Sequence, residues 1–194
     1  MAEQHPSEAR ERVLRAAEHL FSERGYKAVT MRDIANELGM KPASLYNHAP
    51  RGKEDLFIAI TERNLSRHRA GIERAIAEAR PELRAQLLAI AQWLLSQPPT
   101  NLQRMTHSDM PAIAEAEAER LSRLAYQSLL QPIMAAVRAA VERGEADRVR
   151  GPMLAGTFLV AIEGIRDLEQ FTGMSEEIMA NTVIDLLLQG AYPR

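Results

Sequence analysis

Residues 30–48, TMRDIANELGMKPASLYNH, decide the fold of the N-terminal part of the chain. Thr30 can cap a helix, and Asp33 stands three residues later, where the reciprocal partner of a capping box belongs. Gly39 ends that helix after about two turns. Pro42 follows three residues later, and proline is best tolerated at the first position of a helix. The stretch therefore predicts two short helices joined by a tight glycine turn.

An amphipathic helix precedes this stretch. Its apolar residues recur at helical spacing and form one stripe, made of Val13, Leu14, Ala17, Leu20 and Phe21. Gly25 is the natural end of this helix, because glycine accepts the left-handed conformation found there. With a third helix over residues 42–48, the first 48 residues hold three helices, of which the last two form a helix-turn-helix.

The remainder of the chain also reads as helix. Aromatic residues make up only 5% of the sequence, whereas the straight-chain residues and alanine that favour helices are plentiful. No segment alternates apolar and polar residues at period two, so we expect an all-α protein with a small domain over residues 1–52 and a larger helical domain over 53–194. The expected helices of the larger domain cover 53–79, 81–97, 111–143 with a kink at Pro132, 152–171 and 175–189, and residues 102–110 are expected to form a short helix or an irregular stretch.

Composition excludes several classes of protein. The chain has no cysteine, which rules out disulfides, thiolate zinc sites, iron–sulfur clusters and cysteine nucleophiles. No apolar run reaches the roughly 18 residues of a membrane span, and no signal-peptide core is present, so we expect a cytoplasmic protein. We find no phosphate-binding glycine loop, paired-carboxylate site or nucleophile triad, and therefore expect neither an enzyme nor a cofactor. His107 and Asp109 have a metal-ligand spacing, but without a further ligand at helical spacing we expect no metal site.

The charge of the chain is distributed unevenly. The whole sequence carries a net charge of −2, yet residues 24–53 carry six basic and two acidic side chains, a net charge of +4. A short basic segment on an acidic body indicates an anionic partner for that segment.

A set of residues across the first three helices agrees in identity and spacing with a known family; it comprises Val13-Leu14-Arg15-Ala16-Ala17, Leu20-Phe21, Gly25-Tyr26, Thr30, Ile34-Ala35, Leu38-Gly39 and Leu45-Tyr46-Asn47-His48. With these residues, the stretch 8–57 resembles the N-terminal domain of TetR-family transcriptional regulators. The resemblance implies a homodimeric DNA-binding protein, most often a repressor, that a small molecule releases from a palindromic operator. Residues 53–194 would then be the ligand-binding and dimerisation domain.

The sequence departs from the family pattern in two places. Ala49 stands where the family usually has phenylalanine, and Lys53 lies five residues after His48 rather than four. These departures support one alternative, a helical small-molecule-binding module whose helix-turn-helix no longer binds DNA.

In a helix-turn-helix, side chains near the start of the second helix reach base edges in the major groove. The exposed candidates for base contacts are Lys41, Pro42, Ala43, Ser44 and Asn47. The candidates for phosphate contacts are Thr30, Arg32, Tyr46, His48 and Lys53, of which the last three fall on family positions that commonly meet the DNA backbone. The structural alternative is that Tyr46 belongs to the core and His48 is a solvated helix end.

Two further sets of residues are predicted in the larger domain. The resemblance implies that the last two helices form a four-helix bundle across a two-fold axis, and the candidate dimer residues are Gly156, Val160, Gly164, Val183, Leu186 and Leu187. The candidate pocket residues for a mainly apolar effector are Trp93, Met105, His107, Tyr126, Met134, Phe158 and Ile162. The alternatives are close helix packing within one subunit for the glycines and ordinary core for the pocket residues. Glu163 and Arg166 are interpreted as structural.

Overall fold

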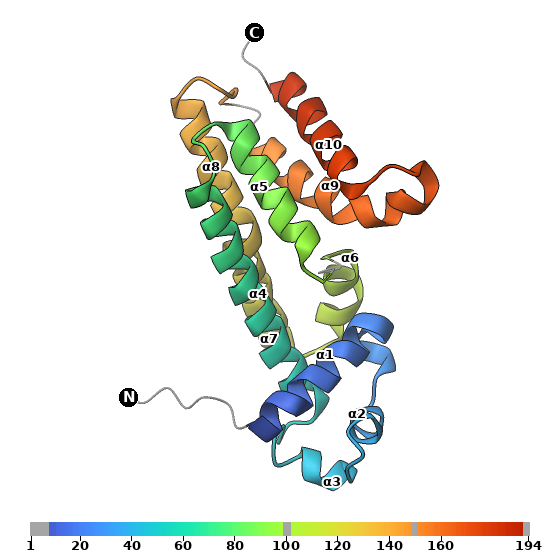
Figure 1. Cartoon of the computed structure of the whole chain (residues 1–194). Coiled ribbons are helices and arrows are strands. Elements are labelled where there is room, and N and C mark those ends of the chain that lie inside the picture. Colours follow the sequence, from blue (N-terminus) through green and yellow to red (C-terminus); the bar gives the residue numbers. More distant parts are fainter. Residues whose placement is uncertain (1–7, 99–101, 149–150, 192–194) are drawn as a thin grey trace. The chain divides into compact units, whose positions relative to one another are not determined.

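The computed structural model describes residues 8–98, 102–148 and 151–191, and within these it contains helices and no strand (Figure 1). The α-helices are α1 (Glu8–Ala28), α2 (Met31–Glu37), α3 (Pro42–Leu45), α4 (Lys53–Glu78), α5 (Leu83–Ser96), α6 (Leu102–Arg104), α7 (Glu115–Ala125), α8 (Gln131–Glu142), α9 (Gly151–Thr172) and α10 (Glu176–Ala191). Two π-helical turns, η1 (Met105–Asp109) and η3 (Tyr126–Leu130), and a 3-10 turn, η2 (Met110–Ala112), interrupt them. The all-α prediction is therefore confirmed.

The chain divides into two compact units, Met1–Asn64 with Gln103–Ser122, and Leu65–Leu102 with Arg123–Arg194. The sequence placed the boundary between residues 52 and 53, whereas the units divide α4 internally. The segment 103–122 joins the N-terminal unit because its side chains bond to α1, a contact over long sequence separation.

The N-terminal unit is held together by an aromatic cluster beneath the first helices. The ring centroids of Phe21, Tyr26 and Phe57 lie 4.8 to 5.8 Å apart, in tilted and edge-on arrangements. Gly25 has φ +78° and kinks α1, which continues for one short turn to Ala28. The prediction of a break at Gly25 is thus confirmed, although the helix does not end there.

The helix-turn-helix forms largely as its sequence predicts. Thr30 and Asp33 make the expected capping box at the start of α2. The second helix is shorter than expected, since α3 ends at Leu45 and residues 46–48 form a turn. The amides of His48 and Ala49 both bond to the carbonyl of Leu45, which closes the chain into that turn. No side chain caps α3, because Lys41 precedes Pro42 where a capping residue would stand.

The second unit contains a helical core built by α5, α8, α9, α10 and the later part of α4. Its largest fully buried side chains include Phe158, Leu87 and Ile133. Arg84 fastens α5 to α10 through a 2.8 Å bond from Nε to Asp185. Figure 1 shows α9 and α10 lying side by side.

The prediction of one long helix over residues 111–143, kinked at Pro132, is wrong in its continuity. The segment is divided into η2, α7, η3 and α8, and the π turn η3 directly precedes Pro132. Proline has no N–H and its ring clashes with the carbonyl one turn earlier, so a regular α-helix cannot continue through it. A π turn, in which the amide of Gln131 bonds to the carbonyl of Tyr126, accommodates the proline. Nowhere in the described ranges is a helix long and apolar enough to cross a membrane.

Candidate functional site

The second helix of the helix-turn-helix, α3, is exposed on one face and is flanked by exposed polar residues. Leu45 and Ala49 are fully buried beneath it. The predicted base-contacting residues that are exposed are Lys41, Pro42, Ala43 and Asn47, whereas Ser44 is half-buried. Tyr46 is 50% exposed, so the alternative that it belongs to the core is wrong, and His48 is half-buried. The local fold therefore separates a core face from a face that can meet a partner.

Thr30 and Arg32 are both exposed at the start of α2. The hydroxyl of Thr30 donates to Oδ2 of Asp33 at 2.6 Å, and the amide of Thr30 donates to the same oxygen at 2.8 Å. These hydrogen bonds hold the pKa of the Asp33 carboxyl below its usual value. The capping box thus fixes the end of α2 that carries the two predicted phosphate contacts.

Lys53 has a role that sequence reasoning missed. Its ammonium donates to the carbonyl of Tyr26 at 2.8 Å and to that of Val29 at 2.9 Å, and it lies 4.3 Å from the Tyr26 ring centroid. Burial lowers the pKa of Lys53 from its ordinary value. The geometry gives Lys53 a positioning role, in which it ties the start of α4 to the end of α1. Its predicted phosphate contact stays a prediction.

The loop before α4 is well ordered by its own contacts. Gly52 has φ +79°, and its amide bonds to the carbonyl of Ala49 at 2.9 Å. The amide of Arg51 donates to Oδ2 of Asp55 at 2.6 Å. Ala49 is completely buried. The two departures that favoured a module unable to bind DNA therefore leave the helix-turn-helix intact.

The segment that follows α6 holds the kinked end of α1. The buried carboxylate of Asp109 accepts a 3.1 Å hydrogen bond from the amide of Tyr26, directly after Gly25. Arg104 donates to the carbonyls of Ser22 and Phe21 at 2.9 and 3.1 Å. These residues carry no recognisable motif, because the contact joins positions about 83 residues apart in sequence.

The predicted pocket residues do not form one cluster in the structure. Met105, which is half-buried, and His107, which is exposed, belong to the N-terminal unit, and the others belong to the second unit. Phe158 and Ile162 are completely buried members of the core. The Tyr126 hydroxyl donates to Sδ of Met134 at 3.6 Å. Trp93 is half-buried on α5, and its Nε1 has no hydrogen-bond partner.

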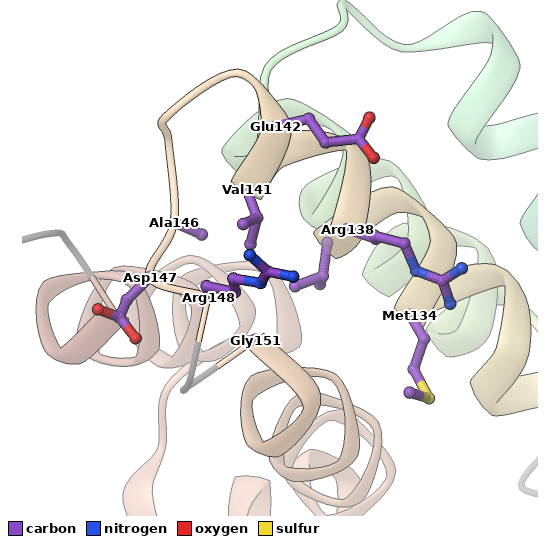
Figure 2. A pocket seen from close by; sticks show the side chains of 9 residues that line it. Met134, Arg138, Val141, Glu142, Ala146, Asp147, Arg148 and Gly151 are labelled. Atoms are coloured by element: carbon purple, nitrogen blue, oxygen red, sulfur yellow. The ribbon is translucent and has the colours of Figure 1, made fainter.

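A cavity of about 700 Å³ opens where α8 ends and α9 begins (Figure 2). Its lining residues are Met134, Val137, Arg138, Val141, Glu142, Ala146, Asp147, Arg148 and Gly151. In Figure 2 the Arg148 side chain reaches toward α8, whereas the Glu142 carboxylate points away. Met134 is the one predicted pocket residue among them. No group of three potential metal ligands occurs among the residues that the structure describes.

The last two helices expose an apolar surface. Among the described residues nothing lies within 4 Å of a Cβ built on Gly156 or Gly164, so the described part of the subunit gives these mid-helix glycines no close packing partner. Val160 is 61% and Leu186 64% exposed. Further exposed apolar side chains on or between α9 and α10 are Met153, Leu168, Phe171, Met174 and Ile178. Val183 and Leu187 are half-buried and pack against the core.

The capped α2, the tight turn and the exposed residues Lys41, Tyr46 and Asn47 around α3, over a buried core, define a helix-turn-helix. Residues 13–60 match the family profile described as "Bacterial regulatory proteins, tetR family". The TetR-family transcriptional regulator PfmR from Thermus thermophilus is 26% identical, over 92% of this chain and 97% of that one, with a TM-score of 0.71. The match assigns the helix-turn-helix of residues 13–60 to the TetR family, and the similarity to PfmR shows that most of this chain has the fold of that regulator.

Two other relatives indicate where the similarity lies. The HTH-type transcriptional repressor KstR2 of Mycolicibacterium smegmatis is 44% identical over 43 residues, which cover 22% of this chain and 21% of that protein. The match spans about a quarter of the length of the first curated relatives. The structure of AibR with isovaleryl coenzyme A and operator DNA is 19% identical, covers 93% of this chain and 98% of that one, and has a TM-score of 0.76. This last similarity shows a shared fold.

Proposed function

We propose that this protein is a homodimeric, ligand-responsive transcriptional regulator, and that it acts as a repressor which a small molecule releases from a palindromic operator. The observation that carries the proposal is the exposure of Lys41, Tyr46 and Asn47 on either side of the short helix α3, in a segment that the buried Leu45 and Ala49 anchor to the core. A bacterial regulator of this kind works in the cytoplasm, where the DNA lies, and binds and releases without catalysing a reaction.

The proposed base contacts follow from side-chain chemistry. Lys41 can donate to guanine, Asn47 can form a bidentate pair with adenine, and Ala43 can touch the methyl group of thymine. Thr30, Arg32, Tyr46 and His48 are the proposed phosphate contacts. All of these side chains are exposed or half-buried in the free protein, so none needs the core to open before DNA binds.

Dimerisation is proposed through α9 and α10. The open space at Gly156 and Gly164 and the exposed side chains of Val160 and Leu186 fit a surface that another copy covers. Exposed apolar surface of this kind is stabilised when a partner removes it from water. A two-fold dimer would present two copies of α3 to the two halves of a palindrome.

The switch is proposed to pass through α4. This helix begins in the unit that holds the helix-turn-helix and ends in the unit proposed to bind the effector. A ligand that favours another position of α4 would change the separation of the two recognition helices, and affinity for a fixed operator would fall. The AibR structure, which has the same fold, contains both an acyl coenzyme A and operator DNA.

The test is DNA binding measured by fluorescence anisotropy against the upstream DNA of the gene itself, as a function of salt. Asn47→Ala should relax base preference, because a base-edge contact contributes about 1–3 kcal/mol of discrimination. Lys41→Ala should lower affinity for the preferred sequence. Arg74→Ala removes a positive charge from an exposed position of the second unit, so it serves as the control and should leave binding unchanged. Binding to no DNA, or equal loss in the control, would contradict the proposal.

Repression is tested by transcription in vitro from the promoter that carries the bound sequence. The protein should lower transcript yield, and a cognate small molecule should restore it. An increase of transcript on addition of the protein would show an activator instead.

A further inference from the structure

Trp93 packs directly on the backbone of α4. A Cβ built on Gly71 would lie 1.9 Å from Cε2 and 2.4 Å from Nε1 of Trp93, so only glycine lets the indole lie there. Arg67 and His68 precede Gly71 by four and three residues, and residues at these spacings share one face of a helix. The edge of the indole that carries Nε1 therefore lies beside the turn of α4 that holds Arg67 and His68.

Two N–H groups on this side of α4 and α5 are buried without an acceptor. Nε1 of Trp93 and Nε of Arg67 are inaccessible to solvent and make no hydrogen bond within the described ranges. Both groups can donate a hydrogen bond and neither can accept one. Because a buried donor without an acceptor is costly, two such donors on facing helices point to a ligand with acceptor oxygens.

Two arginines, Arg67 and Arg166, act on this place, and Nε of Arg166 also lies 3.5 Å from the carboxylate of Glu176. Arg166 on α9 donates to the carbonyls of Leu94 and Gln97 at 3.3 and 2.5 Å, and so holds the last turn of α5, which carries Trp93. His68 is 2% exposed, and its burial, with the charges of Arg67 and Arg166, lowers its pKa to about 4. The imidazole is therefore neutral at neutral pH. Burial, the largest cause of the shift, disfavours any charge here, whereas the positive charges of Arg67 and Arg166 favour an anion.

We propose that Arg67, His68 and Trp93 bind the carboxylate of an amphipathic organic acid, whose apolar chain packs against the helical core of the second unit. The carboxylate oxygens accept hydrogen bonds from Nε of Arg67 and Nε1 of Trp93. The neutral imidazole of His68 makes a third polar contact. Arg166 is a positioning residue, because its guanidinium is occupied by the end of α5. The regulatory meaning of the site rests on the proposed function, since this acid would be the effector.

A carboxylate fits the site better than a doubly charged phosphate. The neighbouring interior is apolar, with Leu94, Ile72 and Phe158 in one continuous core. A single negative charge costs less to bury than two, and one arginine beside it offsets that cost. The sequence predicted a mainly apolar effector, and the donors add an acidic group to it.

The experiment is isothermal titration calorimetry of the full-length protein without DNA. The probes are decanoate, 1-decanol and decylamine, which share one alkyl chain and differ in the head group. We expect decanoate to bind at least about 10-fold more tightly than 1-decanol, and decylamine to bind most weakly. Arg67→Met should abolish the preference for the acid and leave affinity for 1-decanol unchanged. Trp93→Phe keeps an aromatic ring without the N–H and should weaken decanoate alone, by about 3- to 10-fold.

Arg138→Met is the matched control, because it removes one guanidinium from the same unit at the cavity of Figure 2. Equal affinity for decanoate and 1-decanol in the wild type, no binding of decanoate, or a preference that survives Arg67→Met would each overturn the proposal. Loss of the preference in Arg138→Met would place the carboxylate in the other cavity and overturn it as well. Retained affinity for 1-decanol shows that a variant is folded.

The same titration separates this proposal from the proposed function. Decanoate that binds through Arg67 but does not release DNA would leave the carboxylate site established and contradict the regulatory role. Release of DNA by a neutral compound, with no Arg67-dependent binding of decanoate, would support regulation and overturn the carboxylate site.

Discussion

Replacing Gly71 with alanine should destabilise this protein, although alanine is the better helix former. A Cβ at this position would lie 1.9 Å from Cε2 and 2.1 Å from Cζ2 of Trp93, far inside any van der Waals contact. Trp93 must be displaced or α4 and α5 must separate, and overpacking of this kind costs about 1–3 kcal/mol. The higher helix propensity of alanine offsets about 0.5–1 kcal/mol of this cost. We therefore expect Gly71→Ala to lower the free energy of unfolding by about 1–2 kcal/mol.

The effect of Gly71→Ala on the free energy of unfolding should change sign when the indole of Trp93 is removed. In a Trp93→Ala background the new Cβ meets no ring, so Gly71→Ala should raise the free energy of unfolding by about 0.5–1 kcal/mol. The four proteins of this double-mutant cycle are compared by urea unfolding at 25 °C, followed by circular dichroism at one protein concentration, because dimerisation makes stability concentration-dependent. The reasoning is refuted if Gly71→Ala stabilises the wild type, or if it has the same effect in both backgrounds.

Four more results are expected. His68, with its pKa lowered to about 4 by burial and neighbouring arginines, binds a proton more readily in the unfolded chain; its contribution to stability is present above about pH 6.5 and is lost as the pH falls toward 4. Between about pH 7.5 and pH 5 the free energy of unfolding should fall by about 2 kcal/mol more in the wild type than in His68→Gln, as measured by urea unfolding. Lys53→Met should lower the free energy of unfolding by about 1–2 kcal/mol, because carbonyls at the end of α1 lose a charged donor; unchanged stability would contradict the positioning role. Asp109→Ala should cost about 1–3 kcal/mol in the same assay, since the buried amide of Tyr26 loses its acceptor, and a neutral result would show that the contact is not maintained in solution. Gly164→Leu should give a helical monomer of about 21.7 kDa by light scattering, whereas the wild type should be a dimer, and a dimeric variant would remove this glycine from the proposed interface.

The N-terminal helices could be predicted because their signals are local. The capping box of Thr30 and Asp33 and the left-handed glycine conformation act within a few residues, and each is found in the structure where the sequence predicts it. Pro132 was also informative, since a residue without an N–H must interrupt a helix wherever it lies. The form of that interruption, a π turn over Tyr126–Leu130, depends on packing against α9 and was not predictable from spacing.

The sequence by itself determined the helical class, the helix-turn-helix and the exposed polar residues that flank α3, because capping, turn formation and helical periodicity depend on neighbours within about one turn. Only the tertiary structure decided that Lys53 donates to the carbonyls of Tyr26 and Val29. It also decided that Asp109 accepts a hydrogen bond from the amide of Tyr26. It alone also placed the Trp93 ring against Gly71. The physical reason is that these contacts join atoms of different helices, and a one-dimensional pattern specifies which face of a helix is buried but not which residue of another helix lies against it.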